Sequence, residues 1–142
     1  MMEPQAIANL FSALRDGEIR EMRLEDQNLQ FRVFLPRLAN FRGEGFQDFL
    51  CTFRGIKALT FQPFRNESTE IKDLQQINKL QIEIVRAEVG EGGWIRVICS
   101  HKGSQSGARL SLQGEALSVW DEAFDPVSAA ELSILRGKML ER

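Results

Sequence analysis

The residue types that most often carry metal or nucleophilic chemistry are scarce in this chain. Its 142 residues include one histidine, His101, two cysteines, Cys51 and Cys99, and no tyrosine. A zinc site usually needs four ligands, and neither a C-x-x-C nor an H-E-x-x-H spacing occurs. Cys99 and His101 are two positions apart and can share one face of a strand, but no glycine-rich elbow surrounds them. The sequence therefore predicts no metal site, no cofactor and no catalytic residue, and it favours a protein that is not an enzyme.

Long apolar runs are also missing, and the charges are nearly balanced. No run approaches the roughly 18 residues that a membrane-spanning helix needs, and the first 14 residues have no basic segment of the kind that opens a secretory signal. Cys51 and Cys99 lie in apolar runs, which is typical of buried, unpaired thiols in a reducing compartment. A net charge of −2 argues against a dedicated nucleic-acid binder. We therefore expect a cytoplasmic protein that binds neither membrane nor nucleic acid.

The apolar residues follow a pattern of short strands. Hydrophobic residues make up 43% of the chain, and a length near 150 residues predicts a single domain spanning 1–142. Alternating apolar and polar residues recur in short runs between turn residues, which is typical of half-buried strands. The ranges expected to form strands are 18–25, 29–35, 49–53, 57–62, 80–89, 94–100, 108–113 and 116–120. Ile19 is out of phase with Met22 and Leu24, which predicts a bulge in the first of them.

Helices are expected mainly at the two ends. Pro4 and the apolar spacing that follows it predict a helix over 3–14. Asp125-Pro126 is expected to open a C-terminal helix, while Ser128 and Glu131 have capping-box spacing at offset positions. Between these ends we expect a loop over 36–48, one helical turn within 69–74, and loops at 90–93 and 102–107. The strands 108–113 and 116–120 are expected to pair with each other.

This order of elements defines the expected fold class. No segment between strands is long enough for a crossover helix, which excludes a doubly wound α/β fold. The sequence therefore predicts a mainly β (α+β) protein. The two alternatives are an antiparallel β-sandwich and an open barrel, of about eight strands, with N- and C-terminal helices.

Two features are candidates for function. Residues 110–135 hold five acidic residues and no Lys or Arg. Within them Asp121, Glu122 and Asp125 lie next to Trp120. This cluster is interpreted as an acidic patch for a basic partner, as a carboxylate pair for acid–base work or a weak cation site, or as helix capping beside a solvated strand edge. Phe41 and Phe46 flank the Arg42–Gly45 segment and either pack beneath the loop or contact a partner.

A resemblance to a known family rests on five stretches. They are Leu14-Arg15-Asp16-Gly17-Glu18-Ile19 before a hairpin, Cys51-Thr52-Phe53-Arg54-Gly55-Ile56, Leu59-Thr60-Phe61, and the later strands 80–84 and 94–97. This order resembles small bacterial β-rich immunity proteins of polymorphic toxins, the immunity-protein-50-like group. Arg15 stands where the leading motif of that family has His, and the C-terminal helix lies outside the pattern. The resemblance implies a non-enzymatic protein that binds and inhibits a partner, and it transfers no functional residue.

The leading hypothesis from the sequence is a bacterial protein-binding domain with Trp120, Asp121, Glu122, Asp125, Phe41 and Phe46 as partner-binding residues. The expected partner is a protein with a basic surface. Two alternatives stay open. One is a small-ligand-binding or hydrolytic protein with a cleft between sheets. The other is a structural subunit whose Phe-rich loop closes a homodimer.

Overall fold

The computed structural model describes residues 1–66, 68–101 and 104–140. Within these residues the strands are β1 (Glu18–Glu25), β2 (Asn28–Phe34), β3 (Asp48–Arg54), β4 (Ala58–Pro63), β5 (Ile82–Val89), β6 (Ile95–His101), β7 (Ser104–Gln113) and β8 (Ala116–Trp120). The α-helices are α1 (Pro4–Ala13), α2 (Pro36–Ala39), α3 (Leu74–Asn78) and α4 (Ala129–Leu140), and two 3₁₀ turns are η1 (Phe64–Asn66) and η2 (Glu91–Gly93). The prediction of a mainly β protein with helices at both ends is confirmed.

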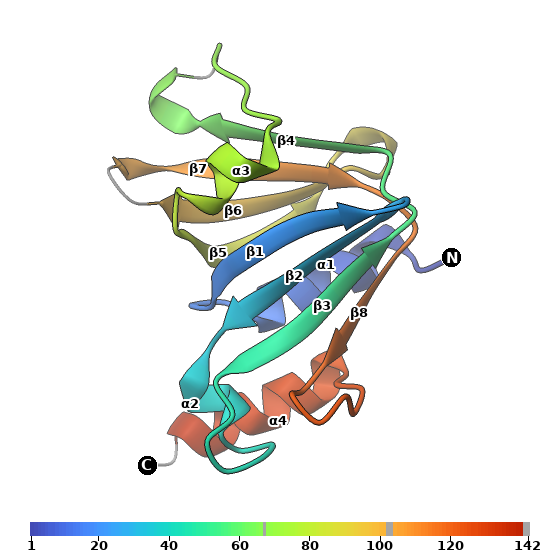
Figure 1. The fold of residues 1–142 in the computed structure, drawn as a ribbon, viewed down its shortest axis with the longest axis vertical. Helices are drawn as coiled ribbons and strands as arrows, with labels where there is room; N and C mark the ends of the chain where they lie inside the picture. Colours follow the sequence, from blue (N-terminus) through green and yellow to red (C-terminus); the bar gives the residue numbers. More distant parts are fainter. Residues whose placement is uncertain (67, 102–103, 141–142) are drawn as a thin grey trace.

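The described strands form one open antiparallel sheet in the order β4-β7-β6-β5-β1-β2-β3-β8 (Figure 1). Seven neighbouring strand pairs hold it together, and β1 and β5 share only two residue pairs, at Glu18–Glu83 and Ile19–Ile82. The strands on the two sides of this short junction are inclined to each other (Figure 1). Of the two predicted architectures, the open barrel is therefore closer to the observed fold than the sandwich is, because the described strands are not divided between two sheets.

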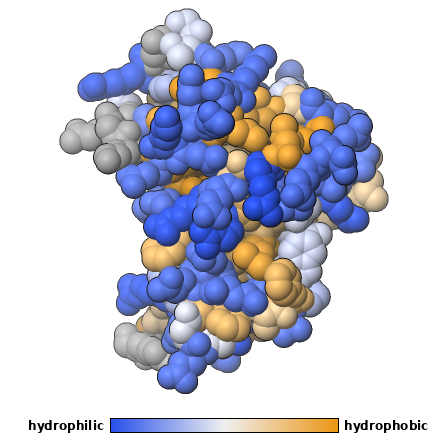
Figure 2. Space-filling view, viewed as in Figure 1, coloured by the Kyte–Doolittle hydropathy of each residue, from blue (hydrophilic) through white to orange (hydrophobic). Residues whose placement is uncertain are grey.

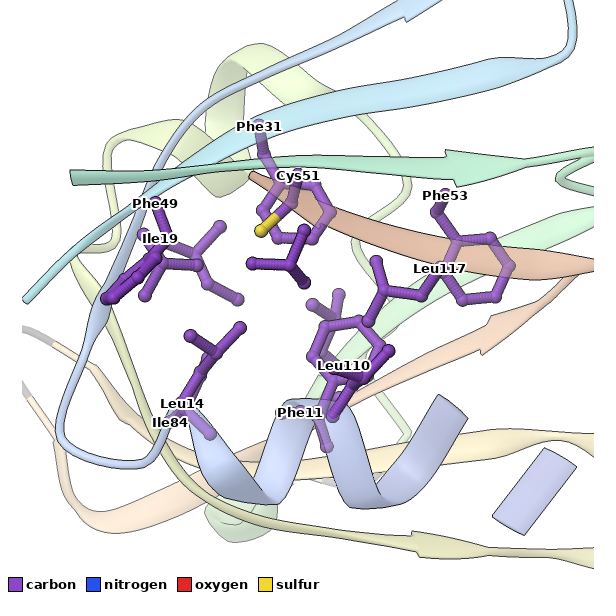
Figure 3. Close-up of a cluster of buried hydrophobic side chains, with 14 of the residues drawn as sticks. Phe11, Leu14, Ile19, Phe31, Phe49, Cys51, Phe53, Ile84, Leu110 and Leu117 are labelled. Carbon is purple, nitrogen blue, oxygen red and sulfur yellow. The ribbon is translucent and has the colours of Figure 1, made fainter. Parts of the chain in front are cut away.

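Helix α1 fills the interior of the curved sheet. Phe11 of this helix and Leu14, which follows its last residue, are fully buried and point at side chains from both halves (Figure 3). The Phe11 ring lies parallel to that of Phe31, with 6.1 Å between centroids, and 6.3 Å from that of Phe53. Full burial of each such ring stabilises the fold by roughly 2 kcal/mol or more. Because apolar and polar residues alternate along the strands, the sheet has one apolar face, and α1 covers it.

The bulge expected in β1 is confirmed. The β1–β2 register shifts between Arg20 and Arg23, so that Ile19 and Met22 both reach the core although three positions separate them. The Met22 backbone exchanges two hydrogen bonds with the side-chain amide of Asn78, at 2.8 and 3.0 Å. These bonds anchor the short helix α3 beside the bulge.

Two of the predicted loop features differ from the structure. The segment 36–48 contains the short helix α2, which begins at Pro36, where the fixed φ of proline suits the first helical turn. The helical turn expected within 69–74 is wrong, because Ile71 forms a bridge with Phe61 of the edge strand β4 instead. Helix α3 begins only at Leu74, where the Asp73 carboxylate caps it by accepting the Gln75 N–H.

The predicted pairing of the last two strands is wrong. β7 lies between β4 and β6, whereas β8 pairs with β3 on the far side of the sheet. The chain crosses from one half to the other at Gly114, where a Cβ atom would lie 2.0 Å from Cε1 of Phe53. Residues 104–107, expected in a loop, belong to β7, while the loop residues Lys102 and Gly103 lie outside the described residues.

The start of the C-terminal helix also differs. Pro126 does not open it, because it bridges Trp120, and the next N–H, of Val127, donates to the Val119 carbonyl. Ser128 is the residue that caps α4. Its hydroxyl accepts the N–H of Glu131, whose carboxylate accepts the N–H of Ser128, which confirms the capping box.

Candidate functional site

A short loop after β8 is built around a buried carboxylate. Asp121 is 2% exposed, and its two oxygens accept from the N–H of Ala123 at 2.9 Å, the N–H of Asp125 at 3.1 Å and Nε of Arg42 at 3.0 Å. Burial opposes ionisation of this group, but the bonds from Asp125, Arg42 and Ala123 outweigh it, so the pKa of Asp121 lies below its usual value. The loop is therefore fixed by an ionised side chain that points inward.

Arg42 connects this loop to two other segments. Besides Asp121, its guanidinium reaches the Glu131 carboxylate at 2.8 Å and the Pro126 carbonyl at 3.3 Å. The pKa of Arg42 is raised, because its bonds to Asp121 and Glu131 outweigh the effect of its burial. One cation thus joins the segment after α2, the loop after β8 and the first turn of α4.

Glu122 is exposed but also has a structural role. Its carboxylate accepts the backbone N–H groups of Gln47 and, at 3.1 Å, of Asp48 at the start of β3. Asp125 is exposed and forms no ion pair with any described residue. Of the three predicted acidic residues, Asp121 is therefore internal, while Glu122 and Asp125 keep negative charge at the surface.

Phe124 at the tip of this loop is displayed to solvent. Its side chain is 73% exposed, and its backbone has φ = +62°, in the left-handed region. Its N–H donates to the Asp121 carbonyl at 3.0 Å, which holds that conformation in place. A non-glycine residue in a sparsely populated backbone region costs about 1–3 kcal/mol and persists only where its surroundings impose it. Phe124 is not among the residues predicted from the sequence, although a lone Phe between Ala123 and Asp125, outside any alternating run, could have indicated it.

The outer face of β1, β2, β3 and β8 is hollowed beside Phe124. This outer groove has a volume of about 370 Å³, and its walls include Trp120, Phe124, Leu50, Thr52 and Gln30. Figure 2 shows hydrophobic surface over β3 and β8 within a largely hydrophilic face. The half-buried ring of Trp120 forms a wall of the groove, and the exposed ring of Phe124 lies beside it.

An ionic cluster borders the groove. Arg32 lies 2.8 Å from carboxylate oxygens of both Glu21 and Asp48, and the hydrogen bond to Glu21 contributes most to raising the pKa of Arg32. Burial raises the pKa of Asp48, against the attraction of Arg32. The Arg32 Nε and the Asp48 Oδ1 are buried and lack a hydrogen-bond partner.

Phe41 and Phe46 lie at the same end of the molecule but in a different groove. Both are half-buried against the core, and both line a groove of about 370 Å³ that also includes Met139 of α4. Both rings pack against the core, as one of the two interpretations predicts, and the other interpretation, contact with a partner, stays a prediction. Arg42 between them is what connects this loop to the predicted acidic residues.

The Cys99 and His101 pair has none of the arrangement that nucleophilic chemistry requires. Cys99 donates to the Ala108 carbonyl at 3.5 Å, and burial raises the pKa of its thiol to about 12. His101 packs edge-on against Phe61, and its two ring nitrogens are buried without a hydrogen-bond partner among the described residues. Cys51 is also a free, buried thiol.

No group of three or more His, Cys, Asp or Glu side chains is placed to hold a metal ion in the part of the chain that the structure describes. No helix among the described residues is long and apolar enough to cross a membrane.

Comparison with known proteins adds no relative. No protein-family model, curated protein or solved structure matches the chain.

Proposed function

We propose that this chain is a non-enzymatic bacterial protein-binding domain that engages its partner through Phe124 and the outer groove. The observation that carries the proposal is the exposure of the Phe124 ring on a loop held in a strained conformation. An aromatic anchor that is rigid before binding loses little conformational entropy when it enters a pocket. The bonds of Asp121 and Arg42 supply that rigidity.

The chemistry around Phe124 supports a partner with a basic surface. Glu122, two positions before Phe124, and Asp125, directly after it, are exposed acids. A pocket on the partner that accepts the phenyl ring and carries Lys or Arg at its edge would complement both features, and the charges would accelerate association at low ionic strength. The contribution of Asp121 is indirect, because its carboxylate is occupied within the loop.

More specifically, we propose that the chain is an immunity-type inhibitor that acts in the cytoplasm. Its support is the resemblance of the β1–β3 and β5–β6 sequence segments to the immunity-protein-50-like group, together with the two free thiols, which suit a reducing compartment. In this role the exposed ring and groove would cover the active surface of a toxin. The neighbouring genes test this form: a large toxin-like reading frame is expected beside this one, and its co-expression should give rescue of growth by wild type but not by Phe124→Ala.

Site-specific photocrosslinking in the native host tests the binding surface directly. A photoreactive phenylalanine at position 124 is expected to capture one defined protein, and Asp125→Lys in the same chain is expected to reduce the yield. The matched control places the same residue at Ile134, which is 60% exposed on α4. Equal capture from positions 124 and 134 would contradict the proposal.

A homodimer is the second candidate, because the same exposed ring could enter the groove of a second copy. Sedimentation at increasing protein concentration distinguishes the two. A dimer that Phe124→Ala dissociates supports self-association, whereas a monomer at all concentrations removes this candidate.

A further inference from the structure

The open sheet leaves an apolar recess at its seam, which carries an inference beyond the proposed function. This seam pocket, of about 290 Å³, lies between the edge strand β4, the β1–β2 hairpin and the start of α3. The apolar residues among those lining it are Leu24, Leu29, Ile56, Leu59, Leu74 and Ala58. Figure 2 shows hydrophobic surface in the region between β4 and the β1–β2 hairpin. None of the residues lining the seam pocket lines the outer groove.

Several apolar side chains that line the seam pocket are partly exposed to solvent. Leu24 is 56% exposed although it pairs with the fully buried Leu29 on the same face of the sheet, because it lies at the turn end of the β1–β2 hairpin. Ile56, Leu59 and Leu74 are half-buried and pack against the core from the other side. Covering such surface is favourable by roughly 25 cal/mol per Å², so an alkyl group suits this recess.

The charged residues lining the pocket favour an anion. Lys57 and Lys72 are both exposed lining residues, and Asp26 is the one acidic residue that lines the pocket with them. Lys57 forms no ion pair with any described residue, and Lys72 has only a 4.0 Å contact with Glu70. Two ammonium groups against one carboxylate leave a net positive charge beside the apolar surface.

The backbone of β4 adds one hydrogen-bond donor. Phe61 exchanges both backbone bonds with Ile71 on the side away from β7. Alternate residues of a strand direct their N–H and C=O groups to the same side, so those of Leu59 face the open edge as well. No described backbone group bonds to Leu59 on that side.

The unpaired part of the β4 edge is too short to pair with another strand. Toward the end of β4, Phe61 is already bridged by Ile71, and Pro63 has no N–H to donate. Leu59 alone is left, and one residue cannot support the ladder that an added β-strand requires. A small ligand fits the opening better than a peptide does.

We infer that the seam pocket binds a medium-chain fatty carboxylate. Its alkyl chain would lie on Leu24, Leu59 and Leu74, and its carboxylate would face Lys57 and Lys72 and accept the Leu59 N–H. The inference is independent of the proposed protein-binding function, since the two sites share no residue.

Titration calorimetry with short carboxylates tests the inference. Hexanoate, octanoate and decanoate are added below their micelle concentrations. Affinity is expected to rise about fourfold with each added methylene. Decanoate is expected to bind more tightly than decyltrimethylammonium, and its binding is expected to weaken as salt is added.

Two pairs of variants separate the charge and the apolar contribution. The double variant Lys57→Gln/Lys72→Gln is expected to weaken decanoate binding about three- to tenfold, whereas Lys79→Gln, an exposed lysine outside the pocket, leaves it unchanged. Leu24→Asn is expected to weaken binding, whereas Val85→Asn, at a residue that is 47% exposed on β5, does not. Both comparisons involve exposed side chains, so folding is preserved.

Three results would overturn the inference. The first is equal binding of decanoate and decyltrimethylammonium. The second is decanoate binding that neither pair of variants changes. The third is binding to vesicles of anionic phospholipid without binding of free decanoate, which would assign the lysines to a membrane surface instead.

Discussion

The Nε of Arg42 donates to the buried carboxylate of Asp121 at 3.0 Å, across 79 positions of the chain. This bond links two segments that are separate features of the sequence, the Phe-flanked loop and the acidic stretch. It also fixes the loop that displays Phe124. The predictions below begin from this contact.

Removing the Asp121 carboxylate is expected to destabilise the protein. Asp121→Ala leaves the Nε of Arg42 and two backbone N–H groups without this acceptor, so the free energy of unfolding should fall by about 3 kcal/mol. Asp125→Ala is the control, because that side chain is exposed, and it should change stability by less than about 0.5 kcal/mol. Urea denaturation measures both. Equal effects of the two variants would show that Asp121 is not the residue that holds the loop.

The same carboxylate predicts a dependence on pH. The pKa of Asp121 is lower in the folded than in the unfolded state, so its stabilisation is present above the unfolded value of about 3.9 and is lost as pH falls through the folded value. Asp48 has a raised pKa and contributes with the opposite sign. The comparison is therefore made between wild type and Asp121→Asn. Their difference in unfolding free energy should be constant near neutral pH and shrink below about pH 4. A difference in unfolding free energy that grows as the pH falls would contradict the assignment of this pH dependence to Asp121.

Phe124→Gly is expected to separate stability from binding. Glycine adopts φ = +62° without steric cost, and the ring it removes is mostly exposed, so stability should rise by up to about 1 kcal/mol. Phe124→Ala retains the Cβ atom and the backbone cost, so it should bring no such gain. Both variants should lose the crosslinking partner. Thermal unfolding measures the first effect. A less stable Phe124→Gly variant would mean that the ring is part of the packing.

Two glycines are expected to respond oppositely to alanine. A Cβ atom at Gly137, in α4, would have no other atom within 4 Å, so Gly137→Ala should stabilise the protein by about 1 kcal/mol through helix propensity. At Gly114 the Cβ atom would overlap Phe53, so Gly114→Ala should cost about 2 kcal/mol or more. Denaturant midpoints of the two variants test the pair. Equal midpoints would show that the crossing beside Phe53 has room to relax.

The sequence by itself determined the individual elements of this protein. Alternation in 29–35 and 80–84 predicted strands, and the phase break after Ile19 predicted the bulge in β1. Pro4 and the Ser128–Glu131 spacing indicated the two terminal helices. These features depend on contacts within a few residues, where side-chain period and capping chemistry decide the outcome.

Only the tertiary structure decided how these elements meet. Sequence order suggested that β7 and β8 pair, yet Gly114 lets the chain pass close to Phe53, and β8 joins β3. The acidic stretch read as one patch, yet Asp121 turns inward because Arg42 reaches it from a distant loop. The strain at Phe124 depends in turn on the bonds around Asp121. Each of these outcomes rests on a contact between residues far apart in the chain, and local propensity does not encode such contacts.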